Sequence, residues 1–244
     1  MEWLSYMSSW AHQVIRPRIS HLDSPYVIPP TSVKSLDKHW ITFIIPTIHR
    51  PTLRRAVRSL FEQTNPLWKA IIVFDGCQPD ERVRAELSDV RIRILCIEKK
   101  GESNNSAGNV RNEGLALVDT EWVGFLDDDD ILSSHYVECL DKERIDNPNV
   151  PCILFRMASS ASWIVPDMTQ PVLRPDNVGI SFAYRIELFH QGLHFISSSM
   201  EDYELLSRIH QAGYSIFVSH YLTYFVNGYR LPLSTHYPRL LIKS

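Results

Sequence analysis

The sequence has few of the features that mark exported proteins or zinc-binding proteins. Only four cysteines occur in 244 residues, with no CxxC pair and no zinc-type spacing: Cys77, Cys96, Cys139 and Cys152. No apolar run approaches the roughly 20 residues of a transmembrane helix, and the first residues lack the basic and long apolar regions of a signal peptide. We therefore expect reduced, structural cysteines, no transmembrane segment and a cytoplasmic location.

The chain also lacks an excess of positive charge. Its formal net charge is −3, from 25 Lys and Arg against 28 Asp and Glu, so no nucleic-acid partner is expected. Hydrophobic residues make up 44% of the chain, which is ordinary for a globular protein of this length with a substantial core.

The first 39 residues contain two segments of different character. The opening segment predicts an amphipathic helix with an apolar face formed by Trp3, Leu4, Met7, Trp10 and Val14. We expect this helix to pack against the domain, and a peripheral position at a membrane face stays open as the alternative. Residues 20–39 are rich in Pro and Ser without periodicity, which indicates a linker or surface strap.

From residue 40 onward, strand patterns and helix patterns alternate. The first strand is predicted in WITFIIP, and a helix is predicted after Pro51, where apolar residues recur at i, i+3, i+4, i+7 and i+8. Further strands are predicted in KAIIVF, RIRILCI, EWVGFL, PCILFRM and SIFVSHYLTYFV, and further helices in SAGNVRNEGLALV, in SHYVECLDKERI and from Glu201 to Ala212. This order predicts an α/β fold with a mostly parallel central sheet flanked by helices.

Polar residues follow three of the predicted strands at the point where each strand ends. Pro46, Thr47, His49 and Arg50 end or follow the first strand, Asp75 ends the second, and four aspartates follow the fourth. In an open parallel sheet, ligands bind outside the carboxyl ends of the strands. We therefore expect these three groups to converge on one edge of the sheet.

Residues 125–132, FLDDDDIL, place four carboxylates side by side. Their repulsion is unfavourable unless solvent, cations or a ligand offsets it. Residues two apart at a strand end point the same way, so Asp127 and Asp129 should share a face while Asp128 and Asp130 point elsewhere. Two carboxylates, together with diphosphate oxygens and water, suit Mg²⁺ or Mn²⁺. A solvated acidic turn is the plain alternative.

A different class of enzyme also carries a DxD motif after an apolar strand. Phosphatases of the haloacid dehalogenase type use the first Asp as a nucleophile and the second as a general acid. Their motif belongs on the first strand of the sheet, whereas three strand-containing units precede it here. The phosphatase hypothesis is therefore disfavoured.

Five segments, taken in order, resemble family 2 glycosyltransferases of the GT-A fold. They are ITFIIPTIHRPTLRRAVRSLFEQT, IIVFDG, GNVRNEGL, WVGFLDDDDIL and MEDYELLSRIHQAGY. The resemblance implies a GT-A (nucleotide-diphospho-sugar transferase) domain over residues 40–228, with a nucleotide-binding half at about 40–130, a smaller acceptor half at 131–228 and a C-terminal tail at 229–244.

The activity that the resemblance implies is a metal-dependent, inverting sugar transfer. The donor would be a nucleotide-diphosphate sugar, with a UDP-sugar favoured, and the acceptor would be a hydroxyl of a glycan or of another molecule. A protein that binds nucleotide sugars without turnover is the alternative from another functional class.

The resemblance also implies which residues contact the donor. Pro46, Thr47 and Arg50 would hold the nucleotide after the first strand, and Arg111 in GNVRNEGL would contact it from a helix. Asp75 would hydrogen-bond the base, commonly uracil, because a carboxylate can accept from a base N–H.

The four aspartates receive metal and donor roles from the same resemblance. Asp129 would be the principal ligand of Mn²⁺ or Mg²⁺, Asp127 a second ligand or a ribose contact, and Asp128 a donor contact, while Asp130 is a candidate for a sugar hydroxyl. The metal would neutralise the charge that develops on the departing nucleoside diphosphate.

Asp202, in SSSMEDYELL, resembles the base that deprotonates the acceptor hydroxyl in this family. Ser199 and Asp202 also fit a capping box, in which Asp202 would only satisfy a backbone donor, and Glu201 could share either role. A helix N-terminus favours the ionised carboxylate. A base at this position therefore needs partial burial or a nearby carboxylate to keep a useful pKa.

Two assignments near the chain end stay open. NGYRLPLSTH carries Tyr229 and Arg230, but the next histidine comes later than in the family, so a third metal ligand from His220 or His236 is undecided. Residues 158–200 should shape the acceptor pocket, where Trp163 would either stack on a sugar or lie in the core.

Overall fold

A computed structural model describes residues 13–15, 39–101, 107–160, 163–167, 169 and 171–229. The helix expected near the start lies outside these residues except at its end, where Val14 belongs to a short strand instead. The elements in chain order are β1 (Gln13–Ile15), β2 (Ile41–Thr47), α1 (Leu53–Phe61), β3 (Trp68–Asp75), α2 (Glu81–Glu86), β4 (Ile92–Ile97), α3 (Gly108–Leu115), β5 (Trp122–Phe125), β6 (Ile131–Leu132), α4 (Tyr136–Asp146), β7 (Cys152–Ser160), β8 (Trp163–Val165), β9 (Phe182–Arg185), α5 (Glu187–His190), α6 (Glu201–Gln211), β10 (Ile216–Phe225) and the 3₁₀ turn η2 (Val226–Gly228).

One sheet runs through the whole described fold. Its main path has the order β1-β10-β7-β9-β5-β2-β3-β4, and β6 and β8 pair with β10 and β7 beside this path. The strands β5, β2, β3 and β4 are parallel to one another. Every residue of β2 is buried, which is the burial expected of a central parallel strand with both faces covered. The predicted parallel sheet is thus correct for this half.

The other half of the sheet is mixed. β9 lies between β5 and β7 and is antiparallel to both, while β10 is parallel to β7 and β1 is antiparallel to β10. The chain leaves β5 through β6 and α4 and reaches β7, and β9 later fills the space between these two strands. The final segment SIFVSHYLTYFV, for which one or two strands were expected, forms the single strand β10.

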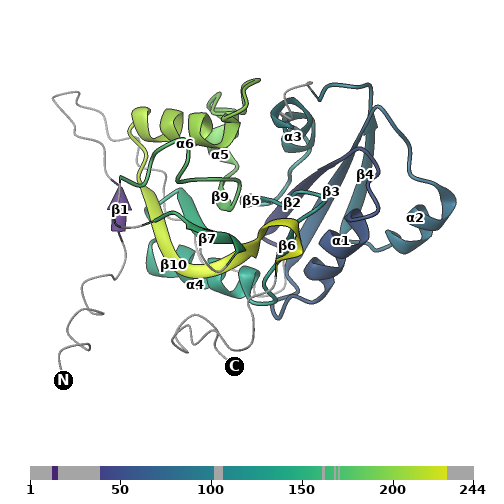
Figure 1. The fold of residues 1–244 in the computed structure, drawn as a ribbon, viewed down its shortest axis with the longest axis horizontal. Helices are drawn as coiled ribbons and strands as arrows, with labels where there is room; N and C mark the ends of the chain where they lie inside the picture. Colours follow the sequence, from purple (N-terminus) through teal and green to yellow (C-terminus); the bar gives the residue numbers. More distant parts are fainter. Residues whose placement is uncertain are drawn as a thin grey trace.

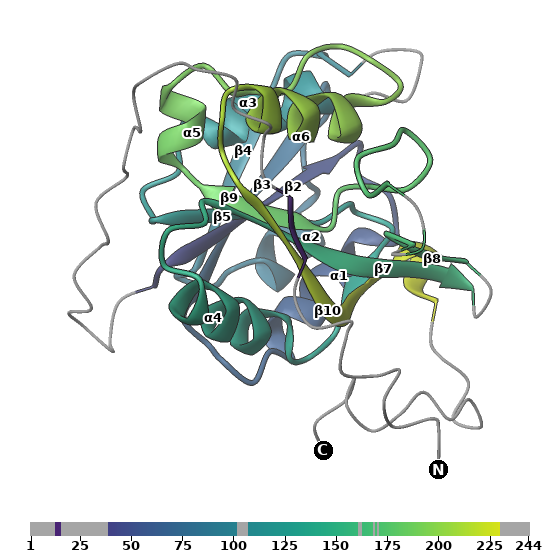
Figure 2. The same cartoon turned by 90° about the vertical axis from the view of Figure 1, so that its left-hand side faces the viewer.

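Helices cover both faces of the sheet. Figures 1 and 2 show α3, α5 and α6 on one face and α1 and α4 on the other. The apolar positions of α1 that the sequence predicted as a buried face are indeed buried, except for Phe61, which is 42% exposed. Thr52, one residue after Pro51, is the N-cap of this helix. No helix in the described part of the chain is both long and apolar enough to cross a bilayer.

The C-cap of α6 is Ala212, where the sequence predicted the end of this helix, and Gly213 follows it. Gly213 has φ +91°, and its N–H donates to the carbonyl of His210 at 3.0 Å, while the N–H of Tyr214 donates to that of Ile209 at 3.2 Å. This pair of bonds is the Schellman arrangement, in which glycine adopts the left-handed conformation without a Cβ penalty.

Candidate active site

The site forms where the strand order of the sheet reverses. β2 pairs with β3 on one side and with β5 on the other, so the loops that follow β2 and β5 leave neighbouring carboxyl ends. A pocket of about 320 Å³ opens there. Its lining residues are Pro46, Thr47, Ile48, Arg50, Asp75, Lys99, Gly101, Ala107, Val110, Arg111, Asp127, Asp128 and Asp129.

This pocket brings together the eight residues that the sequence predicted to contact the nucleotide or to bind the metal ion, whereas the further candidates Asp130 and His220 do not line it. The loop after β2 supplies Pro46, Thr47 and Arg50, the end of β3 supplies Asp75, α3 supplies Arg111, and the turn after β5 supplies Asp127, Asp128 and Asp129. The lining also contains Lys99, which follows β4 and could have been found by the same strand-end rule. The convergence is observed, and the individual roles stay predictions.

The aspartates form a tight turn rather than a continuation of β5. β5 ends at Phe125, and the N–H of Asp130 donates to the carbonyl of Asp127 at 3.1 Å. The turn exposes Asp127, Asp128 and Asp129 to the same pocket. The prediction that Asp128 points away from Asp127 and Asp129 is therefore wrong, because the alternation of a strand does not apply inside a turn.

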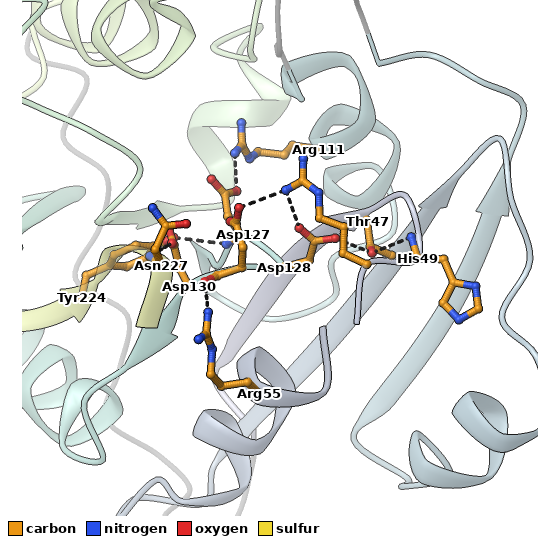
Figure 3. Close-up of polar contacts among 11 residues, drawn as sticks. Thr47, His49, Arg55, Arg111, Asp127, Asp128, Asp130, Tyr224 and Asn227 are labelled. Atoms are coloured by element: carbon orange, nitrogen blue, oxygen red, sulfur yellow. Dashed lines mark hydrogen bonds and ion pairs between the residues drawn. The ribbon is translucent and has the colours of Figure 1, made fainter. Parts of the chain in front are cut away.

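Basic and hydroxyl side chains hold this turn in place. Asp128 accepts from the hydroxyl of Thr47 at 2.6 Å and from Arg50 Nη1 at 3.1 Å, and the same nitrogen lies 3.0 Å from Asp129 Oδ2. Arg55 of α1 donates to the carbonyl of Asp129 at 2.5 Å. Figure 3 shows Thr47 and Arg55 approaching the turn from different directions. Burial raises the pKa of Asp128, although Thr47 and Arg50 oppose this.

The loop after β2 has an unusual backbone conformation at His49. Its φ is +67°, a region where histidine is tolerated better than most residues. Its N–H donates to the Thr47 hydroxyl at 2.9 Å, which leaves the hydroxyl proton for Asp128. The strained residue therefore orients the Thr47–Asp128 contact.

Asp130 faces away from the pocket. It is 4% exposed, and its Oδ1 accepts from the N–H of Asn227 at 2.7 Å. Tyr224 lies beside Asp130 (Figure 3), and its hydroxyl accepts from the N–H of Asp127 at 3.1 Å. Burial, followed by the charge of Asp127, raises the pKa of Asp130 to about 7. The structure thus gives Asp130 a contact with η2 and does not support the predicted contact with a sugar hydroxyl.

Arg111 is a buried cation shared by three carboxylates. Its side chain is 3% exposed, its Nη2 donates to Asp127 Oδ1 at 2.5 Å, and its Nη1 donates to Glu201. Asp202 is the third neighbouring carboxylate. Burial opposes the charge of Arg111, but the three carboxylates outweigh burial and raise its pKa, so the guanidinium stays charged. Figure 3 shows Arg111 reaching toward Asp127.

Asp202 lies in the first turn of α6 with an unsatisfied carboxyl oxygen. Its Oδ1 is buried and accepts no hydrogen bond from the described residues. Burial raises the pKa of Asp202 to about 7, because the charges of Asp127 and Glu201 add to burial and only Arg111 opposes it. A carboxyl group with a pKa near neutrality is suited to general base catalysis.

The capping-box alternative for Asp202 is wrong. The N-cap of α6 is Met200, without a side-chain capping bond, so Ser199 is one position too early. Instead, the hydroxyl of Ser198 accepts from the N–H of Met200 at 3.1 Å and donates to Glu204 at 2.9 Å. The carboxylate of Asp202 is thereby left for another role.

Asp75 is held in place by the loop that follows β4, and its Oδ1 accepts only one of the three hydrogen bonds. Asp75 accepts from the N–H of Lys100 at 2.5 Å, from the N–H of Gly101 at 2.9 Å and from Lys99 Nζ at 2.9 Å. Burial alone would raise the pKa of Asp75, but these hydrogen bonds outweigh it and lower the pKa below its ordinary value. Asp75 is therefore an ionised acceptor that also fixes one wall of the pocket.

A comparison with protein families decides what kind of site this is. The family described as "Glycosyl transferase family 2" matches residues 42–200, which is well over half of the chain. The chain belongs to glycosyl transferase family 2. The resemblance read from its motifs is confirmed, and the phosphatase hypothesis has no support.

Similar curated proteins are also described as glycosyltransferases. An "Uncharacterized glycosyltransferase" of Haemophilus influenzae is 25% identical over 187 residues, which are 70% of this chain and 62% of the relative. "Glycosyltransferase GlyA" of Streptococcus pneumoniae is 32% identical over 108 residues, which are 43% of this chain and 15% of the relative. The chain therefore spans less than two thirds of the length of these relatives.

Solved structures confirm the predicted GT-A fold. S. aureus TarS 1-349, in complex with UDP, matches with a TM-score of 0.61 and 19% identity over 77% of this chain and 60% of that one. The mannosyltransferase PcManGT from Pyrobaculum calidifontis, in complex with GDP-Man and Mn²⁺, matches with a TM-score of 0.55 and 15% identity over 75% of this chain and 57% of that one. At these identities the likeness shows the fold alone.

The two open assignments of this family 2 chain come out differently. His220 lies in β10 with its ring against Tyr221, 4.1 Å between centroids, and does not line the pocket, while His236 falls outside the described residues. Trp163 is 41% exposed at the start of β8, so it is not a core residue. All four cysteines lie in the described residues, and none of them forms a disulfide there.

Proposed function

We propose that this family 2 chain transfers a sugar from a nucleotide-diphosphate sugar to an acceptor hydroxyl, with inversion at the anomeric carbon. The observation that carries the proposal is that Arg111 connects the pocket with Asp202. Arg111 lines the pocket at the strand ends, and it is also the charge neighbour of Asp202, whose carboxyl oxygen has no hydrogen bond. A donor in the pocket would therefore lie beside a carboxylate that can accept a proton.

The donor is proposed to be a UDP-sugar. In the solved complexes, TarS holds UDP and UDP-GlcNAc, whereas PcManGT holds GDP-Man with Mn²⁺. Arg50 and Arg111 offer two guanidinium groups to a diphosphate, and ionised Asp75 offers an acceptor to a base N–H. The TarS complexes support uracil as this base.

The acidic turn fits a divalent cation. Among the described residues, no three His, Cys, Asp or Glu side chains already form a metal-binding cluster. However, Asp127 and Asp129 face the pocket, and each uses only one carboxylate oxygen in a contact with arginine. Oxygen donors of this kind suit Mn²⁺ or Mg²⁺. Bound between Asp127, Asp129 and the donor, such an ion would neutralise charge on the diphosphate.

The surplus of negative charge around the pocket supports the same conclusion. Four carboxylates line the pocket and three cationic side chains oppose them: Asp75, Asp127, Asp128 and Asp129 against Arg50, Lys99 and Arg111. Glu201 and Asp202 add further acidic groups beside Arg111. An anionic diphosphate would be repelled by this balance unless a cation accompanied it.

Asp202 is proposed to act as the base of the transfer step. It would accept the proton of the acceptor hydroxyl while the hydroxyl oxygen forms a bond to the anomeric carbon. The bond between that carbon and the diphosphate oxygen breaks, and its electron pair leaves with the nucleoside diphosphate. Arg111 stays protonated and faces the departing charge.

A panel of nucleotide sugars with Mn²⁺ tests the proposal. We expect slow hydrolysis or transfer with a UDP-sugar, which Asp202→Asn should abolish while UDP binding, followed by calorimetry, stays intact. The anomeric configuration of a transferred product, read by NMR, should be inverted. A wild-type protein that binds donors but turns over none of them would favour the non-catalytic alternative.

A further inference from the structure

We propose that Asn112 and Glu201 are positioning residues that fasten the segment carrying Asp202 to α3, the helix that carries Arg111. We call their contacts the α3–α6 latch: Asn112 with Phe195, and Glu201 with Ala107, Gly108 and Arg111. The inference rests on the proposed function, because it explains how the proposed base is held beside the donor pocket.

The first part of the latch is a pair of hydrogen bonds that the carboxamide of Asn112 makes with Phe195. Asn112 Nδ2 donates to the carbonyl of Phe195 at 2.9 Å, and its Oδ1 accepts from the N–H of Phe195 at 3.1 Å. The side chain thus satisfies both backbone groups of a residue 83 positions away. The ring of Phe195 is 1% exposed and lies edge-on to Phe125, with centroids 5.1 Å apart. Phe195 is therefore a fixed point just before α6.

The second part of the latch is a helix cap supplied from a distance. The N-cap residue of α3, Ala107, makes no side-chain capping bond. Instead, Glu201 accepts from the N–H groups of Ala107 and Gly108 at 3.2 and 2.8 Å. These groups belong to the helix start, where donors have no partner within the helix and a negative charge is favoured.

A glycine makes this close approach geometrically feasible. A Cβ atom at Gly108 would lie 2.7 Å from Glu201 Oε2 and 2.8 Å from Phe195 Cβ. Both parts of the latch therefore meet at one residue without a side chain. Any larger residue would have to push Glu201 and Phe195 away from α3.

The contact between Arg111 and Glu201 also bears on Asp202, which keeps a carboxylate oxygen without a hydrogen bond. Arg111 donates from one terminal nitrogen to Asp127 and from the other to Glu201, while its Nε has no hydrogen-bond partner among the described residues. None of these hydrogen bonds goes to Asp202. Asp202, one residue after Glu201, keeps an oxygen without a hydrogen bond. Without the carboxylate of Glu201, the guanidinium could turn to Asp202 and block its use as a base.

α3 is held on the sheet independently of the latch. A Cβ at Gly114 would lie 2.8 Å from Ile44 of β2, so this helix packs closely on the central strands. The backbone of α3 should therefore stay in place when the contacts of the latch are removed. The expected consequence is a loss of turnover without a loss of donor binding, because misplacing a base by about 1 Å can cost about 100-fold in rate.

The test compares Asn112→Ala with Arg208→Ala. Arg208 makes two hydrogen bonds to the same segment, to the carbonyls of His194 and Gly192 at 2.8 and 3.0 Å, but it comes from α6 itself. We expect Asn112→Ala to lower kcat about 10- to 100-fold with donor KM and UDP affinity within about twofold, whereas Arg208→Ala should keep kcat within about threefold. Glu201→Gln should retain more activity than Glu201→Ala, because its amide oxygen can still cap α3.

Amide hydrogen exchange gives a readout that needs no turnover. Glu201→Ala should speed exchange at Ala107 and Gly108, and Asn112→Ala should speed it at Phe195, while Arg208→Ala should leave all three unchanged. Three outcomes would contradict the proposed latch. They are equal losses of kcat in Asn112→Ala and Arg208→Ala, a loss of UDP affinity that accompanies the loss of kcat, and unchanged exchange in both latch variants. A wild-type protein inactive with every donor would instead overturn the proposed function, and exchange would still decide on the latch.

Discussion

At the scale of single residues, the surroundings of Asp202 set the pH range in which it can accept a proton. Burial and two neighbouring carboxylates raise its pKa to about 7 against the effect of Arg111. Only the ionised form can act as a base, so kcat should fall about tenfold per pH unit below pH 7 and level off above it. Rates measured from pH 5.5 to 8.5 at saturating donor test this, and a flat profile over that range would contradict it.

The same carboxyl should make the fold less stable as the pH rises. Its pKa is about 7 in the native state against an ordinary value of 3.8, so between these values the native state binds a proton that the unfolded state has released. The free energy of unfolding therefore decreases from about pH 4 to pH 7, and the penalty remains above pH 7. Asp202→Asn removes this penalty and should raise the Tm at pH 8 by about 2–4 °C per kcal/mol recovered.

Differential scanning calorimetry at two pH values separates this effect from a general change in packing. The Tm difference between Asp202→Asn and the wild type should be large at pH 8 and small near pH 5. An equal difference at both values would point to packing instead of charge.

Arg50 contacts the carboxylate of Asp129, which is one of the two proposed metal ligands. Its Nη1 lies 3.1 Å from Asp128 and 3.0 Å from Asp129. Arg50→Met should therefore raise the affinity for Mn²⁺ alone by about two- to fivefold, since a partly exposed ion pair is worth up to about 1 kcal/mol. It should weaken UDP binding, because the diphosphate loses a guanidinium. Calorimetry tests both, with Arg54→Met as the control, since Arg54 pairs with Glu86 outside this pocket.

At the scale of secondary-structure elements, the end of α6 allows a prediction that separates stability from activity. Gly213 has φ +91°, and a Cβ there would meet no atom within 4 Å. Gly213→Ala should lower the free energy of unfolding by about 1–2 kcal/mol through backbone strain alone, and Gly213→Asn should cost less. Urea unfolding measures this, and kcat should stay unchanged because α6 begins, rather than ends, at the site.

Elements with a strong local pattern could be predicted from the sequence, and those defined by distant partners could not. β2 and β3 are continuous apolar runs, and the glycine after α6 is a specific stop signal. α2 was missed because Val83 is the only buried residue in its six, although Asp80 caps it through the N–H of Val83 at 2.7 Å. The place of β9 depends on pairing with β5 and β7, which a four-residue strand does not encode locally.

The same distinction applies to the site, where residues at strand ends could be predicted and contacts between distant residues could not. The rule that ligands bind at strand ends led to Thr47, Asp75 and Asp127, because it needs only the order of the elements. The orientation of Asp128 was missed because it depends on a turn. The contact of Glu201 with the start of α3 was missed because it spans 93 residues and leaves no local signal.

At the scale of the whole molecule, the fold concentrates acidic groups at one edge of the sheet. The turn after β5 and the start of α6 bring carboxylates there from residues about 75 positions apart in the sequence, as seen for Asp127 and Asp202. Arg50 and Arg111 offset only part of this charge. The site is therefore expected to bind an anionic donor and a cation together, each increasing the affinity for the other.

This coupling should appear in the thermal stability of the entire protein. UDP with Mn²⁺ should stabilise the wild type by about 2.7 kcal/mol at a hundredfold excess over the dissociation constant. Chelation of the metal, or Asp129→Ala, should remove most of the shift because the cation no longer links the diphosphate to the acidic turn. Asp176→Ala is the matched control, since Asp176 pairs with Arg174 and does not line the pocket. A UDP-dependent shift that persists in full after both chelation and Asp129→Ala would mean that Arg50 and Arg111 hold the diphosphate without a metal ion.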